Sequence, residues 1–154
     1  IKYFDLLIVS LGFLIRIYLG SLESGVELSN FLTIQILIFS LFILVCKRKE
    51  LFFSYDQLIK SNYSLNQLNF FSKLLLILNI LNYFLYLFNE SRFIDSKALE
   101  ISFIIFLILI TRYYFIILKK KIFDPIFIFF NDKFLIFFSI IYVLNFIVSF
   151  YGYY

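Results

Sequence analysis

The sequence contains no methionine, histidine or tryptophan, and its only cysteine is Cys46. Without histidine, the chain cannot by itself supply a histidine general base or a Ser-His-Asp triad. A single cysteine also excludes a Cys/His zinc site and a disulfide framework within the chain. With one proline and four glycines in 154 residues, a collagen-like composition is excluded as well.

The absence of methionine, even at position 1, indicates whether the chain includes the start of the protein. Removal of an initiator methionine requires a small second residue, and Ile1 is not small. We therefore expect residues 1–154 to be the C-terminal portion of one membrane domain whose N-terminal half is absent.

Apolar residues dominate what is present. They make up 63% of the chain, against about 45–50% in soluble domains, which excludes an ordinary cytosolic globule and a disordered chain. Most of them fall into five stretches, each close to the roughly 20 residues of a membrane-spanning helix. The stretches are residues 3–20, 28–46, 70–88, 101–118 and 134–151.

The same stretches must be assigned to helices or strands. Isoleucine and phenylalanine favour strands by propensity. Open strands leave backbone groups unpaired in lipid, however, and these stretches lack the polar alternation of a barrel wall. The sequence therefore predicts an all-α fold, a polytopic membrane bundle of five transmembrane helices.

The placement of charge predicts an orientation. Ten Lys and Arg residues lie at the start of the chain and in the connections around residues 47–73 and 119–133, and two lie in the other two connections. By the positive-inside rule the side with ten is cytoplasmic. We expect an integral protein of the inner (cytoplasmic) membrane, with its active face in the cytoplasm.

A cationic cluster, Lys47-Arg48-Lys49-Glu50, closes the second apolar stretch. Arginine offers phosphate a planar fork and lysine offers it a point charge, and Glu50 could hold a metal ion or orient Arg48. The alternative is a simple anchor to anionic lipid headgroups. Lys2 and Asp5 are expected in the same layer.

Arg112 lies inside the fourth stretch, almost two turns before Lys119. A charge there is costly, so it should face a partner or a polar cavity, or else extend to the interface. Arg16 is expected near the opposite membrane face, in a structural or interfacial role.

Three further features predict local structure. Asp132 precedes the fifth stretch, where it is placed to cap a helix. Asp124-Pro125 marks a turn or the start of a short helix. Asn79 and Asn82, one turn apart, are expected to form hydrogen bonds between helices.

The order of these motifs resembles the C-terminal half of the UbiA-type prenyltransferase superfamily, and within it most resembles the decaprenyl-phosphate phosphoribosyltransferase group. Members have nine helices, and the five from the fifth onward would start inside and end outside. The residues that carry the resemblance are Lys2, Asp5, Gly12, Phe13, Arg16, Gly20, Ser29, Phe31, Lys47, Arg48, Glu50, Leu51, Tyr63, Ser64, Arg112, Tyr113, Asp124, Pro125, Asp132 and Lys133.

The resemblance implies a reaction and a site. A phosphoribosyl diphosphate would be held through Mg²⁺ in a cytoplasmic pocket, and a polyprenyl phosphate would attack C1 of its ribose. The main metal ligands would belong to the absent N-terminal half, so the chain alone should be inactive. The substrate-binding residues implied in this chain are Lys2, Asp5, Lys47, Arg48, Glu50, Tyr63, Arg112 and Asp132.

Two departures and two alternatives accompany the resemblance. Ordinary prenyl-diphosphate members carry a second aspartate pair where this chain has residues 47–50, which favours the phosphoribosyl group over prenyl transfer to an aromatic acceptor. Lys133 stands where the family more often has arginine. The alternative from another class is a non-enzymatic membrane protein, either an assembly subunit or part of a transporter.

Overall fold

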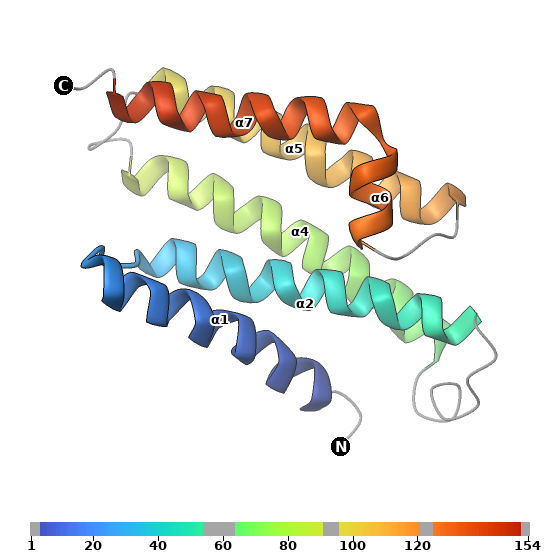
Figure 1. Cartoon of the computed structure of the whole chain (residues 1–154). Coiled ribbons are helices and arrows are strands. Elements are labelled where there is room, and N and C mark those ends of the chain that lie inside the picture. The colour runs from blue at the N-terminus through green and yellow to red at the C-terminus, as the bar shows by residue number, and fades with distance from the viewer. Residues whose placement is uncertain (1–3, 54–63, 91–95, 121–124, 152–154) are drawn as a thin grey trace. The chain divides into compact units, whose positions relative to one another are not determined.

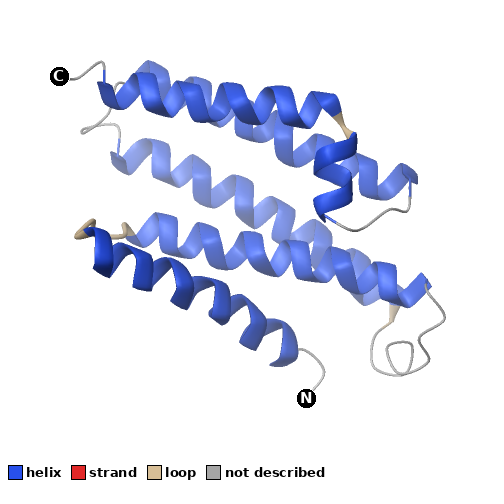
Figure 2. Cartoon of the chain, viewed as in Figure 1, coloured by secondary structure: helices blue, strands red, loops and turns tan. Residues whose placement is uncertain are grey.

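The part of the chain that the structure describes is almost entirely helical. This computed structural model describes residues 4–53, 64–90, 96–120 and 125–151. The long helices are α1 (Phe4–Ser24), α2 (Asn30–Phe53), α4 (Leu65–Glu90) and α5 (Ser96–Lys120), followed by the short α6 (Pro125–Asn131) and α7 (Lys133–Tyr151) (Figure 1). These ranges contain no strand (Figure 2), so the predicted all-α fold is confirmed for them.

The helices have the dimensions of membrane spans. Four of them, α1, α2, α4 and α5, are long and apolar enough to cross a membrane, and α6 with α7 forms a fifth candidate that is bent by 91°. A helix satisfies its own backbone hydrogen bonds, which is what lipid requires of a spanning segment. The short helix predicted at Asp124-Pro125 is α6, with Pro125 at its first position, where the missing N–H costs nothing.

The helices extend further than the apolar stretches. The interpretation of residues 47–73 as a connection is wrong at both ends, because Lys47 lies within α2 and Lys73 within α4. Lys119, likewise assigned to a connection, belongs to α5. Lysine and arginine are good helix formers, so the helices continue past the apolar core. Hydropathy identifies only the apolar middle part of each helix, and it cannot locate the residues at which α2, α4 and α5 begin or end.

Local signals fix the end of α1. Gly25 has a φ of 69°, a left-handed conformation that glycine adopts without a Cβ penalty. The Val26 amide then donates to the Ser21 carbonyl at 3.2 Å, the bond pattern of a Schellman C-cap.

Serine hydroxyls cap two other helices. Ser29 Oγ accepts a hydrogen bond from the Leu32 amide at 3.2 Å at the start of α2. Ser64 Oγ accepts one from the Gln67 amide at 3.3 Å at the start of α4. Each hydroxyl satisfies an amide that has no partner within the helix.

The chain divides into two compact units, residues 1–82 and 83–154, and α4 contributes to both. In the first unit α1 packs on α2 (Figure 1). Its core is built on Leu6, Val45 and Leu68, one from each of its helices, with Leu41, Leu44, Phe71 and Leu75 packed around them.

A network of amide side chains joins α2 to α4 inside the first unit. Gln35 Nε2 donates to Asn79 Oδ1 at 3.0 Å, and Asn82 Nδ2 donates to Gln35 Oε1 at 2.8 Å. Asn79 and Asn82 also donate to the carbonyls of Leu75 and Phe31. The predicted hydrogen bonds between helices are therefore confirmed, and Gln35 is the partner that the sequence did not identify.

Hydroxyl groups play the same part in the second unit. The Tyr83 hydroxyl lies 2.9 Å from Ser102 Oγ and 3.0 Å from the Tyr142 hydroxyl. Asn145 Nδ2 donates to the Ala98 carbonyl at 2.9 Å, which ties α7 to α5. These two helices run side by side in Figure 1.

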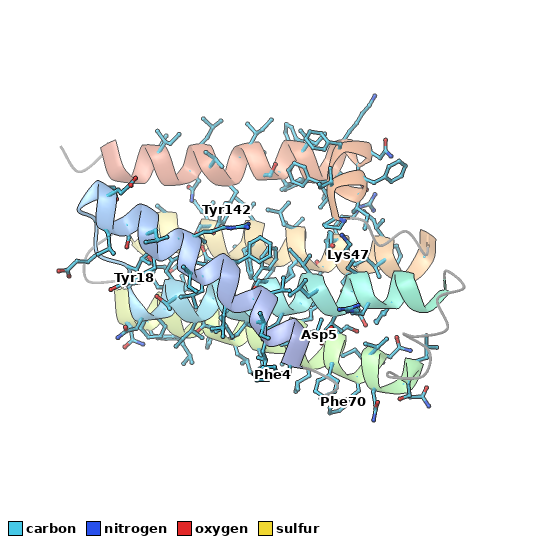
Figure 3. All side chains as sticks on the ribbon, turned by 60° about the horizontal axis from the view of Figure 1, so that its bottom comes forward. Phe4, Asp5, Tyr18, Lys47, Phe70 and Tyr142 are labelled. Carbon is cyan, nitrogen blue, oxygen red and sulfur yellow. The ribbon has the colours of Figure 1, made fainter. Side chains whose placement is uncertain are left out.

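Most of the remaining apolar side chains point outward. Phe4, Tyr18 and Phe70, labelled in Figure 3, are all more than half exposed. Lipid solvates such side chains as well as a protein core does, so helix association in a membrane depends on close packing and polar contacts.

The amide network gives the first testable prediction. Gln35→Leu removes the partner of both asparagines and should lower the free energy of unfolding by about 1–2 kcal/mol. Thermal unfolding of the purified protein in detergent measures the effect. Asn66→Leu, at an exposed position of α4, is the matched control and should change stability by less than half as much. Equal effects of the two substitutions would contradict a stabilising role for the network.

Candidate functional site

The first ion pair joins the beginning of α1 to the end of α2. Arg48 Nη2 donates to Asp5 Oδ2, and the two side chains are 28% and 42% exposed. The pair forms because α1 and α2 are neighbouring helices joined by a short turn, which returns the end of α2 to the start of α1 (Figure 1). Asp5 is labelled near the start of α1 in Figure 3. The expectation that Asp5 shares a layer with the cationic cluster is confirmed.

The three consecutive cations of α2 have different surroundings. Lys47 is exposed, and Arg48 is half-buried against Asp5. Lys49 is only 3% exposed, and its Nζ lies 2.6 Å from Ser72 Oγ of α4. Successive side chains on a helix are rotated by about 100°, so three neighbouring cations point in different directions. Lys47 is accessible to a ligand, Arg48 is oriented by Asp5, and Lys49 is buried.

From the sequence, Lys49 is named only as a member of the cationic cluster, without a prediction of its burial, and Ser72 is not named. A usable signal was present, because Lys49 continues the spacing of Phe42, Val45 and Cys46, all of which are buried. The spacing i, i+3, i+4, i+7 marks one face of a helix. Lys49 therefore belongs to the packed face of α2, and Ser72, buried on α4, is its hydrogen-bond partner.

The second ion pair is in the second unit. Arg112 of α5 donates from Nε at 3.2 Å and from Nη2 at 3.0 Å to the same oxygen, Oδ2, of Asp132. The Arg112 guanidinium also lies 5.4 Å from the centre of the Phe134 ring. Of the alternatives raised by the sequence for Arg112, the structure favours a charged partner, Asp132.

Asp132 uses its two carboxylate oxygens for different purposes. While Oδ2 receives Arg112, Oδ1 accepts the amides of Phe134 and Leu135 at 3.0 and 3.3 Å. The predicted helix cap of α7 is therefore confirmed. A carboxylate at a helix N-terminus is also favoured by the helix dipole, and Arg112 balances its charge.

Arg16 belongs to neither ion pair. Its guanidinium lies 5.7 Å from the centre of the Phe13 ring, one turn earlier on the exposed side of α1. This contact suits the structural role expected for it.

Three of the implied site residues lie wholly or partly outside the described part of the chain. Lys2 and Tyr63 fall outside the described residues, and of Glu50 only the backbone, in the last turns of α2, is described. The structure thus brings together Asp5 with Arg48, and Arg112 with Asp132, and places Lys47 beside Arg48.

The described residues do not by themselves fit a magnesium site. Among them, no group of three or more His, Cys, Asp and Glu side chains is placed to hold a metal ion. Asp5 and Asp132, the carboxylates of the two ion pairs, are each engaged by an arginine. The Mg²⁺ implied by the resemblance therefore has no ligand set in this part of the chain.

No family model matches the chain, and no curated protein matches it either. Function is therefore inferred from the two ion pairs, the membrane helices and the motif resemblance.

The Asp5–Arg48 pair gives the second prediction. Asp5→Ala should destabilise the first unit by about 1 kcal/mol, because it leaves a half-buried arginine without its carboxylate. The swap Asp5→Arg with Arg48→Asp should recover at least half of the loss, as measured by thermal unfolding in detergent. Glu23→Ala, at an exposed carboxylate of the same helix, is the control. A swap less stable than either single variant would argue against the pair.

The double use of Asp132 gives the third prediction. Asp132→Ala should cost about 2 kcal/mol, since it removes a helix cap and an ion pair, whereas Asp132→Asn keeps the cap and should cost about half. In an Arg112→Ala background, the Asn variant should cost almost nothing further. Unfolding free energies of the four combinations measure this coupling, and Glu100→Gln on α5 serves as the charge-neutralising control. Additive effects would show that Arg112 and Asp132 act independently.

Proposed function

We propose that this chain is part of an enzyme that transfers 5-phosphoribose from phosphoribosyl diphosphate to a polyprenyl phosphate at the cytoplasmic membrane face. The motif resemblance to the decaprenyl-phosphate phosphoribosyltransferase group suggests the reaction. One structural observation supports it most: Arg48 is held by Asp5 next to the exposed Lys47 at one end of two membrane helices.

The proposed chemistry is a displacement at the anomeric carbon. An oxygen of the lipid phosphate forms a bond to C1 of the ribose, the bond from C1 to the diphosphate oxygen breaks, and diphosphate leaves with the electron pair. The transition state is oxocarbenium-like, and negative charge builds up on the leaving group. Catalysis then depends on positioning the two anions and neutralising the developing charge.

The α2 cluster suits that task. A guanidinium oriented by a carboxylate presents its donors in a fixed direction, and such a fork matches phosphate oxygens. Lys47 adds a flexible point charge one residue away. Asp5 is then a positioning residue for Arg48, with no direct part in the displacement.

Alternation of the spans adds support from the second unit. If five helices cross in turn, the end of α2, the end of α5 and the start of α7 face the same side of the membrane, which is cytoplasmic by the positive-inside rule. On that topology Arg112 would lie toward that side, and its side chain, 43% exposed, is reachable by a phosphate group. It is the candidate for contact with diphosphate.

A non-enzymatic membrane subunit is the second candidate. The observation that favours it is that both arginines are already neutralised by aspartates within the chain. In that case the ion pairs would serve only to assemble the helices.

The fourth prediction separates the two candidates. In the full natural protein, Arg48→Ala should lower kcat/KM for transfer of labelled ribose phosphate by roughly 100-fold, and Arg48→Lys should recover only part of it. Lys47→Ala should mainly raise KM for phosphoribosyl diphosphate. Membranes that contain the protein, supplied with a polyprenyl phosphate, provide the assay.

Two comparisons make the result decisive. Lys97→Ala, at an exposed lysine expected on the opposite side, should leave turnover unchanged. If Arg48→Ala reduces activity only in proportion to the folded protein that is lost, Arg48 has a structural role only. Absence of any transfer by the unmodified full protein would remove the enzymatic proposal.

A further inference from the structure

Helix α6 is the one described helix that is too short to span a membrane. Its seven residues, Pro125–Asn131, extend about 10 Å, against a hydrocarbon core of about 30 Å. The axes of α6 and α7 differ by 91°, and in Figure 1 α6 lies across the beginning of α7. If α7 crosses the membrane, α6 runs nearly parallel to the membrane surface.

Helix α7 does not need α6 to complete a span. It has 19 residues, which at 1.5 Å each extend about 28 Å, close to the thickness of the hydrocarbon core. Its N-terminus at Lys133 is capped by Asp132, which accepts the amides of Phe134 and Leu135, so the helix has a defined beginning there. The sharp corner is then the end of the span rather than a break within it.

The side chains of α6 fall on two faces. Ile128 is 3% exposed, on a helix that packs against α5 and α7. Ile126, Phe127 and Phe130 are 68%, 51% and 71% exposed, and at about 100° per residue they lie away from the Ile128 side of the helix. So much apolar surface on two turns of helix is unfavourable in water.

The Arg112–Asp132 pair fixes the depth of this corner. Arg112 precedes Lys119 on α5 by seven residues, or about 10 Å along the helix, and it holds Asp132 at its own level. With Lys119 among the lipid headgroups, α6 lies up to about 10 Å further in, at the boundary between headgroups and acyl chains. Amphipathic interfacial helices are found at this depth.

We propose that α6 is an interfacial anchor that lies in the plane of the bilayer. Ile126, Phe127 and Phe130 insert into the acyl boundary, while Lys119 and Lys133, both exposed, contact the phosphates of anionic lipids. Arg112 keeps α6 at this level by holding the residue that immediately precedes α7. The partner is the lipid surface itself, and this proposal does not depend on the enzymatic one.

The absence of tryptophan from the chain allows a direct test. Phe130→Trp introduces a single tryptophan, and its depth is measured in vesicles of phosphatidylcholine and phosphatidylglycerol that carry bromine near the headgroup or near the acyl end. Leu144→Trp, exposed in the middle part of α7, is the deep reference. Shallow bromine should quench the fluorescence of the Phe130→Trp variant roughly twofold more than deep bromine, and the ratio should reverse for the Leu144→Trp variant.

Every other pattern would overturn the proposal. If deep bromine quenched the Phe130→Trp variant as strongly, relative to shallow bromine, as it quenches the Leu144→Trp reference, α6 would be a re-entrant segment. Quenching by aqueous acrylamide but by neither lipid would place it in water, and protection from all quenchers would indicate cover by protein.

A nitroxide label removes the preference of tryptophan for interfaces. Phe130→Cys in a Cys46→Ser chain should be more accessible to oxygen than to a water-soluble nickel complex, but less so than Leu144→Cys in the same background. Greater accessibility to nickel than to oxygen at residue 130 would also overturn the proposal.

Discussion

A polar side chain on an apolar helix must find its partner within the protein, either on its own helix or on a neighbouring one, because the surrounding lipid offers none. This requirement accounts for the hydrogen bonds that join one helix to another in this protein. Gln35 meets two asparagines of α4, and Tyr83 meets hydroxyls of α5 and α7. Apolar packing between the same helices adds close contact but little direction, since the lipid side of each helix is just as apolar.

The two charged pairs follow the same requirement, one at the ends of α1 and α2 and the other between α5 and the start of α7. Arg48 with Asp5 and Arg112 with Asp132 each connect elements that are distant in sequence, and each places a guanidinium where it is held but still partly exposed. An arginine arranged in this way can serve the assembly of the helices and the binding of an anion at the same time. For this reason the phosphoribosyl transfer that we propose and a purely structural role make the same demands on the fold and differ only in what the exposed donors contact.

Much of the architecture was predictable from local pattern. Apolar stretches of span length give helices because no other backbone arrangement in lipid satisfies its hydrogen bonds, and Asp132 before such a stretch gives a cap. The ends of α2, α4 and α5 were not predictable in this way, since charged helix formers extend a helix without adding hydropathy. The bend between α6 and α7 was not predictable either, because Asp124-Pro125 indicates a turn or a short helix but not its direction.

The sequence by itself determined the class of the protein, the number of apolar stretches and the identity of the polar residues that need partners, because these depend on neighbouring residues and on the solvent. Only the tertiary structure decided which partners they find. Arg48 is 43 residues from Asp5, and Arg112 is 20 from Asp132, so each pairing depends on how two helices pack. Which of the cations Lys47, Arg48 and Lys49 is exposed and which is buried depends on the rotation of α2 about its axis. The buried side chains on one face of α2 set that rotation, and they are Phe42, Val45 and Cys46.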